Sequence, residues 1–275
     1  EVYCYYTGMK QDQKTAAIRA LADHWREVCK LSDEELAQLI RRDGIDVLID
    51  LSGHTIDHRL LALARKPAPV QITWLGYGLT TGMQAMDYVL LDRYYAPEHT
   101  AEKVYVEKPV YLPVYRTFRP ESELPVNTLP ALSNGYVTFG SFNNFIKLTE
   151  DVLDVWVQLL HRVSNSRLFI IVGSEELISN VTEFFCGRGI SANRLIVRSR
   201  MNMQDYLQAH HLVDVALDPF PFNGATTSFH SLWMGVPVIT LLGSRIASRT
   251  GLSLLGPLGL EAFVANNRQE YLACG

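Results

Sequence analysis

Apolar residues follow two different spacings along this chain, and these spacings predict where strands and helices fall. Short apolar runs bounded by turn residues predict buried strands, and apolar residues three and four apart predict helices. In the second half, predicted strands cover residues 136–142, 167–172, 194–198, 213–217 and 236–241. Predicted helices alternate with them at residues 150–162, 175–185, 203–210, 228–234 and from residue 246. This regular alternation predicts a doubly wound domain around a parallel sheet.

The first half shows the same alternation less completely. Predicted strands cover residues 2–7, 44–51, 70–75 and 88–91, and predicted helices cover residues 12–30, 32–42 and 58–65. The run at 44–51 is nearly all apolar, which is typical of a parallel strand covered on both faces. Ser32 stands at an N-cap position, with acidic residues in the turn that follows. The first half therefore predicts a partial Rossmann-like lobe.

Residues 113–135 break the pattern. Four prolines fall there among Ser, Asn and Gly residues, namely Pro113, Pro120, Pro125 and Pro130. Such a segment favours a linker or a covering loop. A chain of 275 residues is also long enough for two domains. We therefore expect an α/β protein with one lobe at residues 1–120 and a second at residues 121–275.

Composition narrows the classes of function. The net charge of −4 lacks the basic footprint of a nucleic-acid-binding protein. No apolar run reaches the roughly 18 residues that a membrane span needs. The four cysteines (Cys4, Cys29, Cys186 and Cys274) are isolated, which favours reduced thiols in the cytoplasm over a zinc site. Residue 1 lies inside a predicted strand, so we expect the chain to be cut from a longer one.

Lys147 is the first candidate for ligand chemistry. In an open parallel sheet, ligands bind beyond the carboxyl ends of the strands. Lys147 follows the strand at 136–142 and precedes a helix for which Thr149 is the expected cap. The start of a helix attracts anions through free backbone N–H groups and the helix dipole, and a lysine adds a full positive charge. The alternative is a solvated loop lysine.

A second candidate follows the strand at 213–217. The segment Asp218-Pro-Phe-Pro-Phe-Asn-Gly224 turns at two prolines and leads to Thr226 and Thr227 at a predicted helix start. Gly224 allows the backbone to approach a ligand closely. The two threonines offer hydroxyl and N–H groups where a pyrophosphate would dock. The alternative is ordinary N-capping by one threonine.

Three further residues stand near predicted strand ends, each with an alternative. Tyr206 could present its ring to a nucleobase, or it could be an ordinary core or surface tyrosine. Arg249 lies near a helix start and could bind an anion, or it could form a surface ion pair. His54 follows the strand at 44–51, and a histidine there can be a general base, a hydrogen-bond donor to substrate or a structural loop residue.

The segment Gly76-Tyr-Gly-Leu-Thr-Thr-Gly82 has a spacing like that of a dinucleotide-binding loop. However, the next predicted strand begins at Tyr88, and a parallel crossover needs about a dozen residues. The segment therefore predicts a flexible rim loop rather than an NAD site.

Several stretches, in this order, resemble the catalytic region of the O-GlcNAc transferase family, which includes SPINDLY-type fucosyltransferases and bacterial proteins with tetratricopeptide repeats. The matching stretches are residues 43–55, 65–77, 86–88, 139–144 with Lys147, 213–224, 226–227, 232–240 and 247–249. Each stretch alone is weak, but together they cover nearly the whole chain and are highly specific.

The resemblance implies two Rossmann-like lobes of a GT-B glycosyltransferase, with parallel sheets, helices on both faces and an active site between the lobes. It implies an inverting transfer from a UDP-sugar, most often UDP-GlcNAc, to a Ser or Thr hydroxyl of a protein or peptide. No metal and no other cofactor is expected, and no Asp-x-Asp pair stands at a strand end of the second lobe. A lysine and helix N–H groups can stabilise the departing diphosphate instead.

By position, the resemblance assigns a role to most of the candidate residues. Lys147, Thr226 and Thr227 match pyrophosphate contacts, and Asn144 falls near the phosphate. Tyr206 falls where a histidine lies against the uracil in animal enzymes. The remaining residues of the expected nucleotide-sugar site are Phe222, Asn223, Gly224, His230 and Arg249. Lys147 and His54 are the expected catalytic residues.

Two departures from the family pattern keep the specificity open. His230 falls where many members have an acidic residue that meets the ribose, and Ala225 replaces a histidine or glycine. The family's upstream histidine loop and its acceptor-selecting repeats are outside this sequence, so we expect poor transfer by this chain alone. The alternatives are a non-catalytic nucleotide-sugar-binding module, or a transferase for another sugar (fucose or glucose) or another acceptor such as asparagine.

Overall fold

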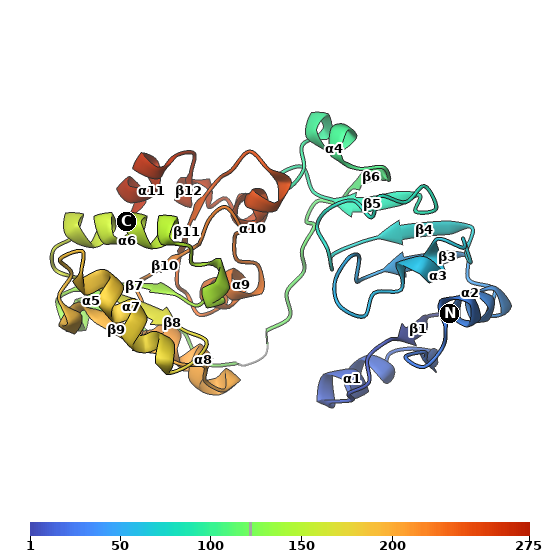
Figure 1. The fold of residues 1–275 in the computed structure, drawn as a ribbon, viewed down its shortest axis with the longest axis horizontal. Coiled ribbons are helices and arrows are strands. Elements are labelled where there is room, and N and C mark those ends of the chain that lie inside the picture. The colour runs from blue at the N-terminus through green and yellow to red at the C-terminus, as the bar shows by residue number, and fades with distance from the viewer. Residues whose placement is uncertain (121–122) are drawn as a thin grey trace. The chain divides into compact units, whose positions relative to one another are not determined.

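The structure, a computed structural model, describes residues 1–120 and 123–275. It divides into two compact units, Glu1–Tyr115 (unit 1) and Arg116–Gly275 (unit 2). The boundary expected between residues 120 and 121 falls at residues 121–122, which lie outside the described part of the chain. Figure 1 labels the elements of each unit.

Unit 1 contains two parallel sheets. Strands β1 (Tyr3–Tyr6) and β2 (His24–Glu27) form a pair, and a four-stranded sheet has the order β3-β4-β5-β6. Its strands are β3 (Val47–Asp50), β4 (Val70–Thr73), β5 (Tyr88–Leu91) and β6 (Lys108–Tyr111). The helices are α1 (Gln13–Arg19), α2 (Asp33–Arg42), α3 (Leu60–Leu63) and α4 (Glu98–Val104). The sequence pattern missed α4 and β6.

The helix expected at residues 12–30 is wrong. Asp12 caps α1 by accepting a hydrogen bond from the Thr15 amide, but the helix ends at Arg19 and the chain continues as β2. Strand β2 pairs in parallel with β1, and the His24 amide donates to the Val2 carbonyl at 3.0 Å. Pairing with a strand about twenty residues away therefore outweighs the local helical pattern.

Strand β3 is covered on one face only, in contrast to the expectation of burial on both faces. Leu48 packs with residues of α2 and α3, whereas Val47 and Ile49 are 50% and 46% exposed. The predicted N-cap of α2 is confirmed, because Ser32 and Glu35 form a reciprocal capping box. Helix α2 is thus fixed at its start and covers the buried face of the sheet.

Unit 2 is a doubly wound domain around one parallel sheet with the order β12-β11-β10-β7-β8-β9. The strands are β7 (Val137–Ser141), β8 (Ser166–Ile171), β9 (Leu195–Arg198), β10 (Val215–Leu217), β11 (Val238–Leu241) and β12 (Val264–Ala265). The helices are α5 (Pro130–Asn134), α6 (Glu150–Arg162), α7 (Glu176–Cys186), α8 (Met203–Ala209), α9 (Thr226–Trp233), α10 (Thr250–Leu255) and α11 (Arg268–Cys274). Every strand and helix predicted in this half is confirmed to within a few residues, and α5, β12 and α11 were missed.

The core of unit 2 positions the ligand-facing edge of the sheet. Trp156 of α6 is fully buried, and its indole N–H donates to the Tyr271 hydroxyl at 3.2 Å. That hydroxyl donates to the Asp218 carbonyl at 3.1 Å, just after β10. The strand order reverses between β7 and β10, so a switch point lies there. Ligands of doubly wound domains bind at the carboxyl ends of strands at such a point.

Candidate functional site

A pocket of about 260 Å³ opens at the carboxyl ends of β7, β8 and β9 in unit 2. It is lined by Phe142, Asn143, Asn144, Phe145, Ile171, Val172, Gly173, Arg200, Met201, Tyr206 and Thr227. Small-molecule sites typically measure roughly 300–1,000 Å³, so this pocket has room for part of such a ligand. The sequence analysis predicted three of its residues, namely Asn144, Tyr206 and Thr227.

Aromatic rings form one wall of this pocket. Tyr206 of α8 lies edge-on to Phe142, with ring centres 5.6 Å apart. Beneath them, His210 stacks on Phe142 at 3.5 Å with nearly parallel planes. Tyr206 also lies edge-on to His230 of α9, and its hydroxyl is 3.3 Å from His230 Nδ1. Tyr206 and His230, which the sequence analysis singled out separately, are therefore brought into contact.

His210 contributes an uncharged imidazole ring to this aromatic wall. Its ring is fully buried, and burial lowers the pKa of the ring to about 4. Nδ1 lies 3.0 Å from the Tyr206 carbonyl, which can only accept, so Nδ1 carries the proton. Nε2 has no hydrogen-bond partner among the residues that the structure describes. The ring is therefore uncharged near neutral pH and stacks on Phe142 as a flat aromatic ring.

Lys147 is held in place rather than solvated, which rules out the alternative of a free loop lysine. It ends a short 3-10 helix (Phe145–Lys147), for which the Asn144 side chain provides the cap. Its Nζ donates to the Asn223 carbonyl at 2.9 Å and lies 4.5 Å from the centre of the Phe222 ring. Burial lowers the pKa of Lys147, while the charge of Asp218 opposes this shift.

Asp218 closes the loop that leads from β10 to α9. One of its carboxylate oxygens accepts from the Gly224 amide and the other from the Thr240 hydroxyl, both at 2.6 Å. Burial raises the pKa of Asp218 to about 7, and these hydrogen bonds and the nearby Lys147 oppose the shift. A Cβ on Gly224 would lie 2.5 Å from Ser228 Oγ. Glycine at this position therefore allows the loop to pack closely against α9.

Helix α9 begins without a side-chain cap. Ala225 occupies the N-cap position, and Thr226 and Thr227 are the first helical residues. N-capping by a threonine, the alternative reading of this pair, is therefore wrong. The Thr227 hydroxyl instead donates to Asn143 Oδ1 at 2.9 Å, which connects α9 to the end of β7. The uncapped start directs amide groups and the positive end of the dipole toward solvent.

Buried polar atoms around the start of α9 lack partners. Ser228 Oγ and Asn223 Oδ1 are both buried and have no hydrogen-bond partner among the described residues. Buried polar atoms are normally paired, because an unmade hydrogen bond costs about 1–3 kcal/mol. These two atoms are therefore a local cost in stability beside the start of α9.

One expectation for this region, the cap at Thr149, changes in the structure, and the binding role of Arg249 stays a prediction. Thr149 stands at the N-cap position of α6 as expected, but its side chain makes no capping hydrogen bond. Arg249 lies at the end of a 3-10 turn (Ile246–Arg249) and does not line the pocket. Thr226 and Phe222 are exposed, whereas Asn223 and Gly224 are buried.

Sequence reasoning missed Phe142, Asn143, Gly173 and Arg200, which all line the pocket. Their positions just after the predicted strands could have identified them. Gly173 lies two residues after β8, and Arg200 lies two residues after β9. Phe142 and Asn143 directly follow β7.

His54 lies in unit 1, on the turn that follows β3. Asp50 ends β3, and its carboxylate accepts from the Ser52 amide at 3.1 Å and the Gly53 amide at 2.9 Å. Gly53 has φ +54°, and a Cβ there would lie 2.4 Å from Tyr77 Cβ, so the turn requires glycine. His54 itself is exposed, with Nε2 3.1 Å from the Thr81 carbonyl.

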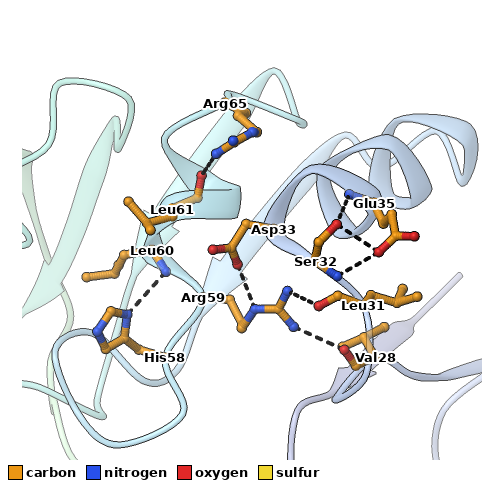
Figure 2. Close-up of polar contacts among 10 residues, drawn as sticks. All are labelled: Val28, Leu31, Ser32, Asp33, Glu35, His58, Arg59, Leu60, Leu61 and Arg65. Atoms are coloured by element: carbon orange, nitrogen blue, oxygen red, sulfur yellow. Dashed lines mark hydrogen bonds and ion pairs between the residues drawn. The ribbon is translucent and has the colours of Figure 1, made fainter.

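Arg59 follows His54 by five residues, and Figure 2 shows its hydrogen bonds. Its Nε donates to Asp33 Oδ1 at 2.8 Å, near the start of α2. Its two terminal nitrogens donate to the Val28 carbonyl at 3.0 Å and the Leu31 carbonyl at 2.7 Å. A single guanidinium thus ties the turn to the backbone before α2.

The loop from Gly76 to Gly82 is anchored, so the expectation of a flexible rim loop is wrong. The Tyr105 hydroxyl donates to the Gly78 carbonyl at 2.7 Å. The buried Glu107 carboxylate accepts from the Thr81 amide at 2.7 Å and from the Thr80 hydroxyl at 2.7 Å. No local sequence pattern indicates these contacts, because Tyr105 and Glu107 come about 25 residues later.

In the described part of the chain, no cluster of three or more His, Cys, Asp and Glu side chains has the geometry to hold a metal ion. Within residues 1–120 and 123–275, no helix has the length and apolar character of a membrane span.

Comparisons with known proteins agree with this architecture. The family model of glycosyl transferase family 41 matches residues 1–119 and 125–274. A probable UDP-N-acetylglucosamine–peptide N-acetylglucosaminyltransferase SPINDLY from Eustoma exaltatum subsp. russellianum is 39% identical over 99% of this chain. The Arabidopsis thaliana protein of the same description is 38% identical over 99% of this chain. The chain spans 31% of the length of each of these two relatives.

A solved structure of a Thermobaculum terrenum O-GlcNAc transferase mutant is 40% identical, with a TM-score of 0.90. The match covers 100% of this chain and 53% of that one. It confirms the predicted fold class, two Rossmann-like lobes of the GT-B type with parallel sheets. The family model accounts for nearly every residue of both units, and this chain therefore belongs to glycosyl transferase family 41.

Proposed function

We propose that the full-length protein transfers N-acetylglucosamine from UDP-GlcNAc to Ser or Thr hydroxyls of a protein or peptide, with inversion at the anomeric carbon. The observation that carries this proposal is the 40% identity, over the whole chain, to a solved O-GlcNAc transferase. The names of the SPINDLY relatives support the same donor and a peptide acceptor. A cytoplasmic location and the absence of a nucleic-acid partner stay predictions.

In this proposal the pocket of unit 2 binds the nucleotide. The uracil stacks on the aromatic wall at Tyr206, because an exposed ring face suits a flat base. The diphosphate lies at the uncapped start of α9, where the Thr226 hydroxyl and the backbone amides, including that of Thr227, donate hydrogen bonds. Asn144 lies at the pocket rim near this start, and His230 reaches the ribose side through its contact with Tyr206.

Lys147 has the proposed catalytic role on the donor side. Its ammonium is bound to the loop that leads into α9, at the Asn223 carbonyl. When the bond between the anomeric carbon and the phosphate oxygen breaks, the electron pair leaves with UDP and the diphosphate gains negative charge. A fixed cation stabilises that charge more in the transition state than in the ground state. Arg249 does not line the pocket and stays a proposed contact of the donor.

His54 has the proposed role on the acceptor side. The acceptor oxygen forms the new bond to the anomeric carbon, and its proton must go to a base or to water. His54 is exposed on an anchored turn, so its ring is accessible to an acceptor hydroxyl. A positioned histidine contributes typically 10²–10⁴-fold to rate in such proton transfers.

The test is a transfer assay on the full-length protein with an acceptor protein or peptide. UDP-GlcNAc, UDP-glucose and GDP-fucose are supplied separately, and intact mass reports the sugar that is added. We expect a mass gain of one N-acetylhexosamine per site with UDP-GlcNAc and a much slower reaction with the other donors. A gain of deoxyhexose from GDP-fucose would instead assign a fucosyltransferase, and binding without any transfer would assign a non-catalytic module.

A further inference from the structure

Glu107 is a buried carboxylate that the proposed chemistry does not use. It directly precedes β6, and only 2% of the residue is exposed. Its two carboxylate oxygens accept hydrogen bonds from the Thr80 hydroxyl, the Thr81 amide and the Thr81 hydroxyl. No ion pair of Glu107 occurs among the described residues. A buried charge costs several kcal/mol of desolvation, so this carboxylate depends on the three hydrogen bonds from the loop.

These hydrogen bonds fix one peptide group of the loop from both ends. The peptide between Thr81 and Gly82 has the Thr81 carbonyl at one end and the Gly82 amide at the other. The Gly82 amide donates to the Thr80 hydroxyl at 3.0 Å, and that hydroxyl donates to Glu107. The carbonyl end of the same peptide lies 3.1 Å from His54 Nε2. Glu107 therefore controls the direction in which the Thr81 carbonyl points.

The Thr81 carbonyl in turn decides where His54 carries its proton. A carbonyl oxygen only accepts, so the hydrogen bond requires a proton on Nε2. In the neutral ring the lone pair is then on Nδ1, and the hydrogen bond at one ring nitrogen sets the state of the other. His54 Nδ1 makes no hydrogen bond within the described residues, and the side chain is exposed.

We propose that Glu107 is a positioning residue for His54: through Thr80 and the Thr81–Gly82 peptide it keeps the His54 ring protonated at Nε2, which leaves Nδ1 as the atom that accepts the acceptor's proton. This inference rests on the proposed function for the identity of the proton that is moved. The tautomer of His54 is a property of unit 1 alone.

The decisive variants are Glu107→Gln and Thr80→Val, which are nearly isosteric with the native residues. A glutamine has one acceptor oxygen, so its NH₂ group faces Thr80 if the oxygen keeps the Thr81 amide. The Thr80 hydroxyl already accepts from the Gly82 and Val106 amides, at 3.0 and 3.3 Å, and cannot pair with that NH₂ group. Thr80→Val deletes the same hydroxyl, and with it one hydrogen bond to Glu107, but leaves the Glu107 carboxylate itself unchanged. Thr80→Ser keeps the hydroxyl and serves as the matched control.

The first measurement is the ¹⁵N spectrum of the histidine rings in this protein, with the His54 signals assigned by their loss in His54→Gln. We expect a single Nε2–H tautomer in the native protein and in Thr80→Ser. We expect a mixture of both tautomers in Glu107→Gln and in Thr80→Val. An unchanged Nε2–H tautomer in both of these variants overturns the inference, and if Glu107→Gln does not fold, Thr80→Val alone decides.

The second measurement is steady-state kinetics of the full-length protein. Glu107→Gln and Thr80→Val are each expected to lower kcat in proportion to the population that has lost the Nε2–H tautomer, about twofold for an equal mixture, with little change in the KM for UDP-GlcNAc. A purely structural role would change melting temperature without moving the tautomer. If the tautomer mixes but kcat is unchanged, the positioning by Glu107 stands and the proposed proton transfer to His54 is wrong.

Discussion

Ionisable side chains behind the pocket are shifted toward their neutral forms by burial. Burial lowers the pKa of Lys147 and raises that of Asp218 to about 7, and the attraction between the two charges opposes both shifts. The Lys147 ammonium is thus a poorly hydrated cation whose only described hydrogen-bond acceptor is the Asn223 carbonyl. Such a cation gains more from a nearby anion than a solvated lysine does, since little water must be displaced.

Lys147→Met is therefore expected to lower kcat/KM by at least about tenfold in the full-length protein. Methionine keeps the apolar contact over Phe222 and removes the charge, and a lost charge-assisted contact of ~1.5–3 kcal/mol corresponds to one to two decades in rate. Steady-state kinetics measure the effect, and circular dichroism checks folding. Thr227→Ala should reduce the rate less, because backbone amides remain at the α9 start. Native turnover by Lys147→Met would refute the assigned role.

At the residue scale, sequence reasoning found the residues that belong to short local motifs. Lys147, Thr226 and Thr227 were singled out because they stand directly beside a predicted strand end or helix start, and their binding roles stay predictions. Glu107 could not be found, because its partners lie about 26 residues away and a single buried glutamate has no local pattern. His210 was missed for a similar reason, since its stacking on Phe142 is a contact across the fold.

At the scale of elements, three other parts of unit 1 contact the loop from Gly76 to Gly82 and hold it in place. Its first residue lies against the end of β3, where a Cβ on Gly76 would come within 2.0 Å of the Leu51 carbonyl oxygen. The far end is bound by Glu107, and the middle by Tyr105. Packing thus explains the glycines at Gly76 and Gly78, whereas Gly82 is explained by its left-handed backbone.

Two alanine substitutions in this loop are expected to differ sharply. Gly76→Ala drives a methyl group into backbone and should lower the free energy of unfolding of unit 1 by about 3 kcal/mol, at the upper end for overpacking. Gly82 has φ +74° but open space around a Cβ, so Gly82→Ala should cost only about 1 kcal/mol for the left-handed backbone. Urea unfolding of both variants tests this, and equal losses would contradict the steric argument.

Element prediction succeeded where local pattern and tertiary packing agree. In unit 2 the amphipathic spacing of α6 and the apolar runs of β7 and β8 lead to a core around Phe139, Trp156 and Ile170. In unit 1 the segment 12–30 has a helical pattern, but β2 forms there because β1 offers a parallel partner. Strand β6 was missed because Lys108 and Pro109 break its apolar run, although it pairs with all four residues of β5.

For the whole molecule, the proposed donor site belongs to unit 2 alone. UDP is therefore expected to raise the melting temperature and to slow amide exchange at the ends of β7 and β9 and at the start of α9, while β3 to β6 are unaffected. EDTA should leave both effects unchanged, because Lys147 and the α9 start supply the positive charge. Hydrogen exchange with and without EDTA measures this. Loss of UDP binding in EDTA would show that a metal ion carries the diphosphate.

The parallel arrangement of every strand in unit 2 has a practical consequence for handling the protein. The segments that leave the carboxyl ends of β7, β8 and β9 line the pocket, and the segments that enter these strands lie at the other edge of the sheet. Ser164 and Asn165 before β8 and Gly189 before β9 are exposed there. An affinity handle attached at this edge would tether the protein to a surface through the side of the sheet opposite the pocket. A fluorophore attached there would be separated from the pocket by the width of the sheet.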